Sequence, residues 1–270
     1  MNRIDETFER LRRERRAGFI SFFTAGHPDL ETTNELLLAA ERAGSDLVEL
    51  GIPFSDPIAD GPIIQASYAR VLSQALTPPM IFRAVKNVRP SLALPLIAMI
   101  SYSLVYHMGE ERFLDEATQA GFDGAIVPDL PSEEGKTLLE MAKRRDFKTV
   151  LLVAPNTSAE RRKSIAERST GFIYYVSLLG ITGAREKLPP ELQEGLKALR
   201  KITAKPIGVG FGISRPDQAE TLAPLADAVI VGSAIVKRIE ELSSRGGPEI
   251  LSEVESYIHS MSQALSKVRK

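Results

Sequence analysis

Two carboxyl groups are the strongest candidates for chemistry in this sequence. Glu49 lies inside an otherwise apolar run, residues 47–51 (LVELG), where burial makes an unpaired charge costly and raises its pKa. A carboxyl in that setting can act as a general acid or base near neutral pH, but an ion pair with a Lys or Arg on a neighbouring strand would also explain it. Asp60 follows in a loop rich in Pro, Asp and Gly, where it could join that chemistry or simply turn the chain and cap a helix.

Glycine-rich segments suggest a phosphate site. They stand at residues 180–183, 210–212 and 232–233, each directly after an apolar run. Glycine lets the main chain approach a ligand closely, and the start of a helix presents unpaired N–H groups to an anion. Any one of these segments could merely end a strand, but three in succession predict phosphate binding. The candidate residues are Thr182, Gly183, Gly210, Phe211, Gly212, Gly232 and Ser233.

Short apolar runs that alternate with helical patterns must position these residues. We predict strands at residues 18–24, 47–51, 94–100, 124–128, 149–154, 172–177, 206–210 and 228–232. Apolar runs without polar alternation are typical of parallel strands buried on both faces. Eight strand–helix units in 270 residues favour an α/β fold of the (β/α)8 TIM-barrel type, as a single domain over residues 1–270. An open sheet of two similar halves is the alternative.

The predicted helices complete the barrel and add to it. Between the strands we expect helices at residues 30–43, after 61, and at 110–120, 132–145, 159–167, 191–202, 216–222 and from 233. An extra N-terminal helix is expected at residues 5–15, and additional helices at 77–88, after the second strand, and at 248–268, after the eighth. Because barrel chemistry lies at the carboxyl ends of the strands, both carboxyls and the glycine segments should meet on one face.

Composition limits the classes of function. The formal net charge of −1 gives no overall attraction to nucleic acid or membrane, and the chain has no Cys and only three scattered His, so no metal site is expected. The arginine cluster at residues 10–16 could be a nucleic-acid arm, but intervening Glu residues favour a solvated helix face. Without a signal-like or membrane-spanning apolar run, we expect a cytoplasmic protein.

One segment also carries a family resemblance. Residues 49–62 (ELGIPFSDPIADGP) closely resemble the most characteristic segment of the tryptophan synthase alpha subunit family. Further matches follow in family order from the first strand to the last, so the resemblance covers essentially the whole chain. They are TAGHP at 24–28, PDLP at 128–131, APNT at 154–157, TGAR at 182–185 and GVGFGI at 208–213.

The resemblance implies a retro-aldol cleavage of indole-3-glycerol phosphate into indole and glyceraldehyde 3-phosphate, without metal or organic cofactor. Glu49 would be the catalytic acid and base, and Asp60 would stabilise positive charge near the indole N–H. Tyr174 matches an active-site tyrosine, although it could be an ordinary strand aromatic, and Thr182 matches a threonine that holds Asp60 when the site is closed. Phe22, Leu50 and Ile100 would line the indole pocket but could equally be core, and Gly183, Gly212, Gly232 and Ser233 would bind phosphate near Phe211.

The resemblance also implies a partner, the pyridoxal-phosphate-dependent beta subunit, in an α2β2 assembly. Residues 99–104 read MISYSL where many members read MTYxNP, which puts the contact with the beta subunit in doubt. Leu178 stands where many members have Arg, which puts the closure of that loop in doubt. A free-standing lyase, a non-catalytic activator of the beta subunit and another phosphate-binding barrel enzyme remain alternatives.

Overall fold

The strands of this protein close into a barrel. The computed structural model describes residues 1–57, 60–176, 190–210 and 212–268. Eight parallel strands pair in sequence order, and β8 pairs back with β1. They are β1 (Gly18–Thr24), β2 (Leu47–Gly51), β3 (Leu96–Met99), β4 (Gly124–Ile126), β5 (Lys148–Val153), β6 (Ile173–Val176), β7 (Ile207–Gly210) and β8 (Ala228–Val231). The predicted TIM barrel is confirmed, and the open-sheet alternative is wrong.

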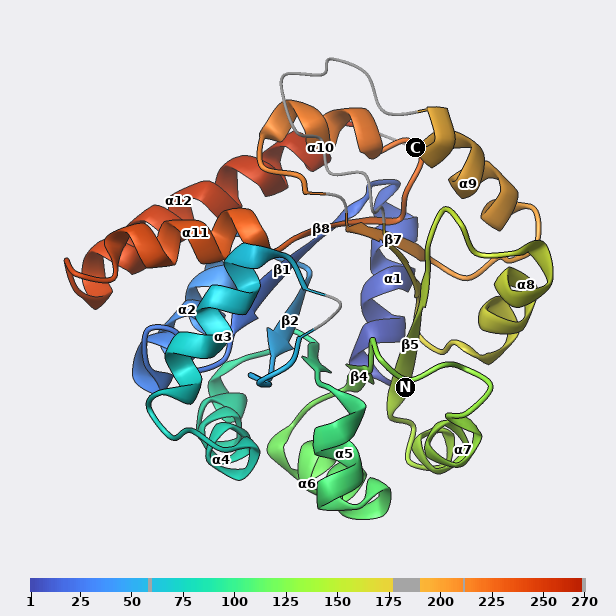
Figure 1. The fold of residues 1–270 in the computed structure, drawn as a ribbon. Coiled ribbons are helices and arrows are strands. Elements are labelled where there is room, and N and C mark those ends of the chain that lie inside the picture. The colour runs from blue at the N-terminus through green and yellow to red at the C-terminus, as the bar shows by residue number, and fades with distance from the viewer. Residues whose placement is uncertain (58–59, 177–189, 211, 269–270) are drawn as a thin grey trace.

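Helices surround the strands on the outside of the barrel, except α1, which lies across one end of it (Figure 1). They are α1 (Arg3–Glu14), α2 (Leu30–Arg42), α3 (Pro62–Leu72), α4 (Pro78–Val88), α5 (Tyr102–Met108), α6 (Glu110–Ala120), α7 (Lys136–Arg144), α8 (Ala159–Arg168), α9 (Pro190–Arg200), α10 (Pro216–Leu222), α11 (Ser233–Leu242) and α12 (Gly247–Ser266), with a short 3-10 helix η1 (Arg89–Ser91) after α4. None of the helices in the described part of the chain is long and apolar enough to cross a membrane.

The barrel interior is a packed core closed at one end by α1. Ile4, Phe8 and Leu11 of that helix form one apolar cluster with inward-facing strand residues such as Ile20 and Leu47. Their spacing along α1 places all three on one helical face, so burying that face fixes the helix against the barrel. The amino-terminal end of the barrel is therefore filled, and a hollow inside the barrel must lie at the carboxyl ends of the strands.

A second, larger apolar core lies between the strands and the outer helices. Successive strand residues point to opposite faces, so Phe19, Phe23, Val48 and Leu50 belong to this outer core. The same alternation turns Glu49 inward, between Val48 and Leu50. The strand pattern thus decides which side chains can reach a ligand inside the barrel.

The structure departs from the sequence-based prediction mainly after β3. Helix α5 is present where no helix was predicted, and α7 begins at Lys136 rather than at residue 132. The start of α5 is held by side chains from two places: Ser101 accepts a hydrogen bond from the backbone N–H of Ser103, and Asp129 accepts one from the N–H of Tyr102 at 2.8 Å. Asp129 follows β4, so half of this cap is a tertiary contact that a local pattern does not reveal.

Candidate active site

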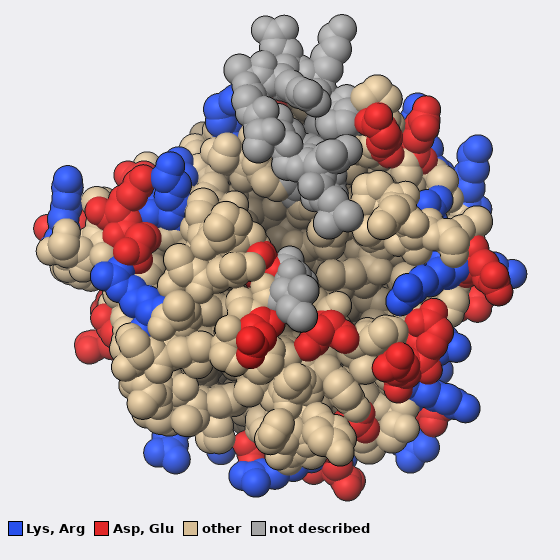
Figure 2. Space-filling view, in the orientation of Figure 1, with Lys and Arg blue, Asp and Glu red and all other residues tan. Residues whose placement is uncertain are grey.

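A cavity of about 620 Å³ opens at the carboxyl ends of the strands. Figure 2 shows a hollow near the middle of this face, with acidic side chains at its edge. Most of the predicted site residues line the cavity together, although they come from loops and strands far apart in the sequence. Those residues are Phe22, Glu49, Asp60, Tyr174, Gly210, Gly212, Gly232 and Ser233.

Glu49 is fully buried and unpaired. Its side chain has no solvent exposure, and neither carboxylate oxygen has a hydrogen-bond partner among the described residues. Burial alone raises its pKa from 4.5 to about 8, so the group is protonated at neutral pH. Glu49 forms no ion pair with a described Lys or Arg, so the structural ion pair that the sequence allowed is not present among these residues. A protonated carboxyl facing a cavity can give a proton to a bound substrate and later accept one.

Asp60 enters the same cavity from the loop before α3. Burial, and then the nearby charge of Asp129, raise its pKa from 3.8 to about 6, so it is largely ionised at neutral pH. The amide of Gln65 donates to the backbone carbonyl of Asp60 at 2.7 Å and thereby fixes the end of the loop. The N-cap of α3 is Gly61, and no side chain caps this helix. Asp60 is therefore not the helix cap that the sequence allowed.

Tyr174 lies across the cavity on β6, close to the backbone of β7. A Cβ at Gly210 would clash with the ring and hydroxyl of Tyr174, so the absence of a side chain at Gly210 makes room for it. Burial raises the pKa of Tyr174 well above 10, and the charges of Glu49 and Asp60 raise it further. Tyr174 therefore stays neutral at neutral pH and lines the cavity as an uncharged side chain.

The N-terminus of α11 lies at the cavity. Gly232 is its N-cap, and among the residues that the structure describes no side chain accepts a hydrogen bond from the first N–H groups of this helix. Gly232 and Ser233 both line the cavity, together with Gly210 and Gly212. Unpaired N–H groups at a helix start favour an anion, with a dipole contribution of about 0.3–1 kcal/mol. The arrangement suits a phosphate group.

The apolar part of the cavity differs from the prediction at two of three positions. Phe22 lines the cavity and packs with Val236. Leu50 does not line it, because strand alternation turns this side chain toward the outer helices, opposite to Glu49. Ile100 lies in a smaller neighbouring cavity of about 280 Å³, which it shares with Asp60. The prediction was therefore wrong for Leu50. Ile100 lines only the neighbouring cavity, which shares Asp60, Met99, Pro128 and Asp129 with the main one.

Three predicted residues, Thr182, Gly183 and Phe211, lie outside the described residues, as does the family departure at Leu178.

Two residues beside the carboxyl groups were not predicted as site residues from the sequence. Tyr68 on α3 is 3% exposed and lines the smaller cavity with Asp60, and a Cβ at Gly51 would lie 2.5 Å from its hydroxyl oxygen. Asp129 lines both cavities and accepts a hydrogen bond from the hydroxyl of Ser101 at 2.6 Å. The spacing of Ile64, Tyr68 and Val71 predicts an inward helix face, which was the available signal for Tyr68. For Asp129 the available signal was its place in the PDLP segment at 128–131, which resembles the family.

Comparisons with known proteins agree with one another. A family described as "Tryptophan synthase alpha chain" matches residues 8–266. The tryptophan synthase alpha chain of Thermoanaerobacter sp. (strain X514) is 45% identical over 98% of this chain and all of the relative, and that of Synechocystis sp. is 44% identical over 98% and 100%.

Solved structures are similar over the same length. Tryptophan synthase subunit alpha from Legionella pneumophila str. Paris superposes with a TM-score of 0.91 at 34% identity, covering 99% of this chain and 100% of that one. A chain of the tryptophan synthase a2b2 complex from Pyrococcus furiosus gives a TM-score of 0.85 at 38% identity, covering 92% and 98%.

Proposed function

The chain belongs to the tryptophan synthase alpha chain family, and from this premise we propose that it cleaves indole-3-glycerol phosphate to indole and glyceraldehyde 3-phosphate. The observation that supports this reaction most directly is the pair of carboxyl groups in one cavity, Glu49 protonated and Asp60 ionised at neutral pH. Carbon–carbon cleavage requires indole to leave, and indole leaves readily only after protonation at C3.

In the proposed mechanism, Glu49 works first as an acid and then as a base. Its carboxyl protonates indole C3, and the resulting carboxylate takes the proton of the hydroxyl on the adjacent side-chain carbon. The bond between C3 and that carbon breaks, its electron pair returns to the indole ring, and the hydroxyl carbon becomes the aldehyde. The raised pKa of about 8 suits a group that must hold a proton at the start of this cycle.

Asp60, Tyr174 and the helix N-terminus support that step in the same proposal. Protonation of C3 places positive charge on the indole nitrogen, and an ionised Asp60 nearby stabilises it. The phosphate binds to the backbone N–H groups at Gly232 and Ser233, together with Gly212, and so fixes the glycerol chain. Tyr174 orients the substrate through its neutral hydroxyl. Phe22 contacts the indole ring.

We infer a beta subunit as partner, in an α2β2 assembly like the Pyrococcus furiosus complex to which this chain is similar. Residues 99–104, which differ from the family pattern, lead from β3 into α5. Within them, Ser101 and Tyr102 donate hydrogen bonds to Asp129. A change in the partner contact there would be transmitted toward Asp60 through Asp129. A cytoplasmic location is part of this proposal, and cell fractionation tests it.

The decisive experiment measures glyceraldehyde 3-phosphate formation from indole-3-glycerol phosphate through a coupled dehydrogenase, with and without a cognate beta subunit. Turnover that rises with the beta subunit and is lost in Glu49→Gln supports the lyase and its partnership together. High turnover without any effect of the beta subunit leaves the chemistry intact and indicates a free-standing lyase. No turnover in either condition rejects the lyase and favours a ligand-binding activator.

A further inference from the structure

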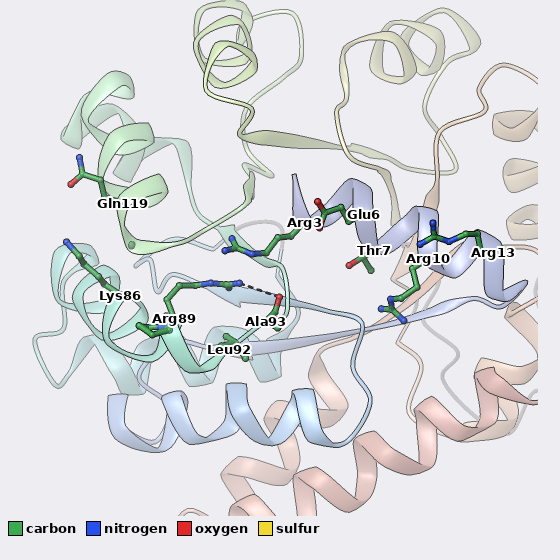
Figure 3. A pocket seen from close by; sticks show the side chains of 12 residues that line it. Arg3, Glu6, Thr7, Arg10, Arg13, Lys86, Arg89, Leu92, Ala93 and Gln119 are labelled. Carbon is green, nitrogen blue, oxygen red and sulfur yellow. Dashed lines mark hydrogen bonds between the residues drawn. The ribbon is translucent and has the colours of Figure 1, made fainter. Parts of the chain in front are cut away.

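A second, larger hollow lies at the opposite end of the molecule, outside the barrel. This groove, of about 940 Å³, runs between α1 on one side and the α4–η1 segment with the end of α6 on the other. Five cationic residues and one carboxylate, Glu6, line it: Arg3, Arg10, Arg13, Lys86 and Arg89. Figure 3 shows Lys86 at one end of the groove, Arg3 and Arg89 in the middle, and Arg10 and Arg13 at the other end.

The α1 side of the groove is rigid. Arg3, Arg10 and Arg13 recur at helical spacing, whereas Ile4, Phe8 and Leu11 turn the other side of the helix into the barrel core. The side chain of Asn2 ties the start of α1 to the body through hydrogen bonds to the carbonyls of Asp123 and Asp146 at 2.9 and 2.7 Å. The arginine cluster that looked like a solvated face in the sequence thus forms one wall of a groove.

The facing side contributes a partly desolvated cation. The Arg89 side chain is only 11% exposed, and its terminal nitrogens donate to the carbonyls of Leu94 and Ala93 at 2.7 and 3.4 Å. Its Nε is buried without a hydrogen-bond partner among the described residues. Burial lowers the pKa of Arg89, so the charged form lacks full compensation and would gain from a nearby anion.

Acidic partners satisfy only part of this charge. Asp123 pairs with Arg3 at 2.9 Å and lies 4.0 Å from Arg89, while Asp46 and Glu14 both pair with Arg10. Arg13 and Lys86 are exposed and form no ion pair with any residue in the described ranges. The groove therefore keeps an excess of positive charge at both of its ends.

We propose that this groove binds a linear polyphosphate anion. Guanidinium groups bind phosphate oxygens in bidentate fashion, and cations spaced along a groove match an anion whose charge is spread along a chain. The lining contains no aromatic side chain, so it offers no platform on which a base could stack. With a net charge of −1, the chain also lacks the basic balance typical of nucleic-acid binders. The phosphates themselves are recognised, whether they come from inorganic polyphosphate or from a nucleoside triphosphate.

Calorimetric titration of the full chain with sodium tripolyphosphate tests the proposal. We expect one site with a Kd on the order of 0.1 mM, at least about tenfold tighter than for orthophosphate, and weaker at high salt. ATP that binds as tightly as tripolyphosphate indicates recognition of the phosphates alone, whereas ATP that binds much more tightly indicates a nucleotide as the source. A short single-stranded RNA that binds more tightly than either would overturn the proposal in favour of nucleic acid.

Matched variants locate the site. Arg13→Gln and Lys86→Gln should each weaken tripolyphosphate binding about five- to tenfold. Arg12→Gln on α1 and Arg83→Gln on α4 remove cations that are also exposed but lie outside the groove, and should change binding less than about twofold. An equal loss of binding in the two groove variants and the two control variants would indicate general electrostatic attraction and would overturn the proposal. Unchanged binding in Arg13→Gln and Lys86→Gln would indicate that tripolyphosphate binds in the barrel cavity, and would also overturn the proposal. All four variants should keep normal lyase activity.

Discussion

Two buried carboxyl groups, one just before β2 and one inside it, differ in their hydrogen-bond partners. Asp46, just before the strand, is 3% exposed and fully paired: it accepts hydrogen bonds from Arg10 at 2.8 Å, from Arg16 at 2.7 Å and from the backbone N–H of Phe19 at 3.0 Å. Glu49, inside the strand, is equally buried and has no partner among the described residues. Pairing makes Asp46 a fixed structural anion, whereas isolation makes Glu49 a weak acid available to a ligand.

Glu49→Gln should have the largest effect, on the reaction. The amide keeps the shape of the side chain but cannot exchange a proton, so kcat should fall about 10³-fold or more, equivalent to about 4 kcal/mol of barrier. The coupled assay for glyceraldehyde 3-phosphate measures it.

The same variant should be more stable than the wild type above pH 5. The pKa of Glu49 is higher in the folded chain, so between about pH 4.5 and pH 8 the folded state holds a proton that the unfolded state has released, and stability declines with pH. Gln removes that decline, and thermal unfolding at pH 5 and pH 8 should differ less in the variant. If Glu49→Gln keeps its activity or is less stable than the wild type, Glu49 is not the unpaired proton donor that distinguishes it from Asp46.

Asp46→Asn should have the opposite effect. Losing the carboxylate leaves Arg10 and Arg16 without their buried partner, so the free energy of unfolding should drop by about 3 kcal/mol. The kcat of the folded protein should stay near wild type, because Asp46 lies at the far end of β2 from the cavity. Denaturant unfolding measures the loss, and Asp217→Asn, at an exposed ion pair with Arg215, is the control, with a change within about 0.5 kcal/mol.

The pH profile of kcat/KM should have two limbs. Activity needs Asp60 ionised and Glu49 protonated, so it should fall below about pH 6 and above about pH 8. Beyond each limb the loss should approach about tenfold per pH unit. Asp60→Asn should remove the acidic limb from whatever activity remains, and an acidic limb that persists would assign it to another group.

Tyr68→Phe should give the smallest effect. The variant removes a buried hydroxyl beside Asp60 while keeping the ring that packs with Phe22, so kcat/KM should decrease about fivefold with little change in stability. The acidic limb should move upward if the hydroxyl stabilises the ionised form of Asp60. Tyr106→Phe, 71% exposed on α5, is the matched control and should leave both unchanged.

Much of this protein could be predicted from its sequence because its periodicity is local. The apolar runs defined the eight strands, with β1 and β2 predicted to the residue, since strands buried on both faces have few polar interruptions. A polar residue inside such a run singled out Glu49. The glycines that approach the cavity were visible for the same reason, because their residue type reflects a local backbone requirement.

Only the tertiary structure decided which neighbours each side chain meets. Among the described residues it left Glu49 without a partner and gave Asp46 three. It also turned Leu50 away from the cavity and brought Asp129, from the loop after β4, to the start of α5. It also placed Arg13 and Lys86 at the two ends of one groove, although the sequence suggested only a solvated face for the arginine cluster on α1. Burial and electrostatic pairing depend on contacts between distant segments, and no local pattern in a single sequence encodes those distances.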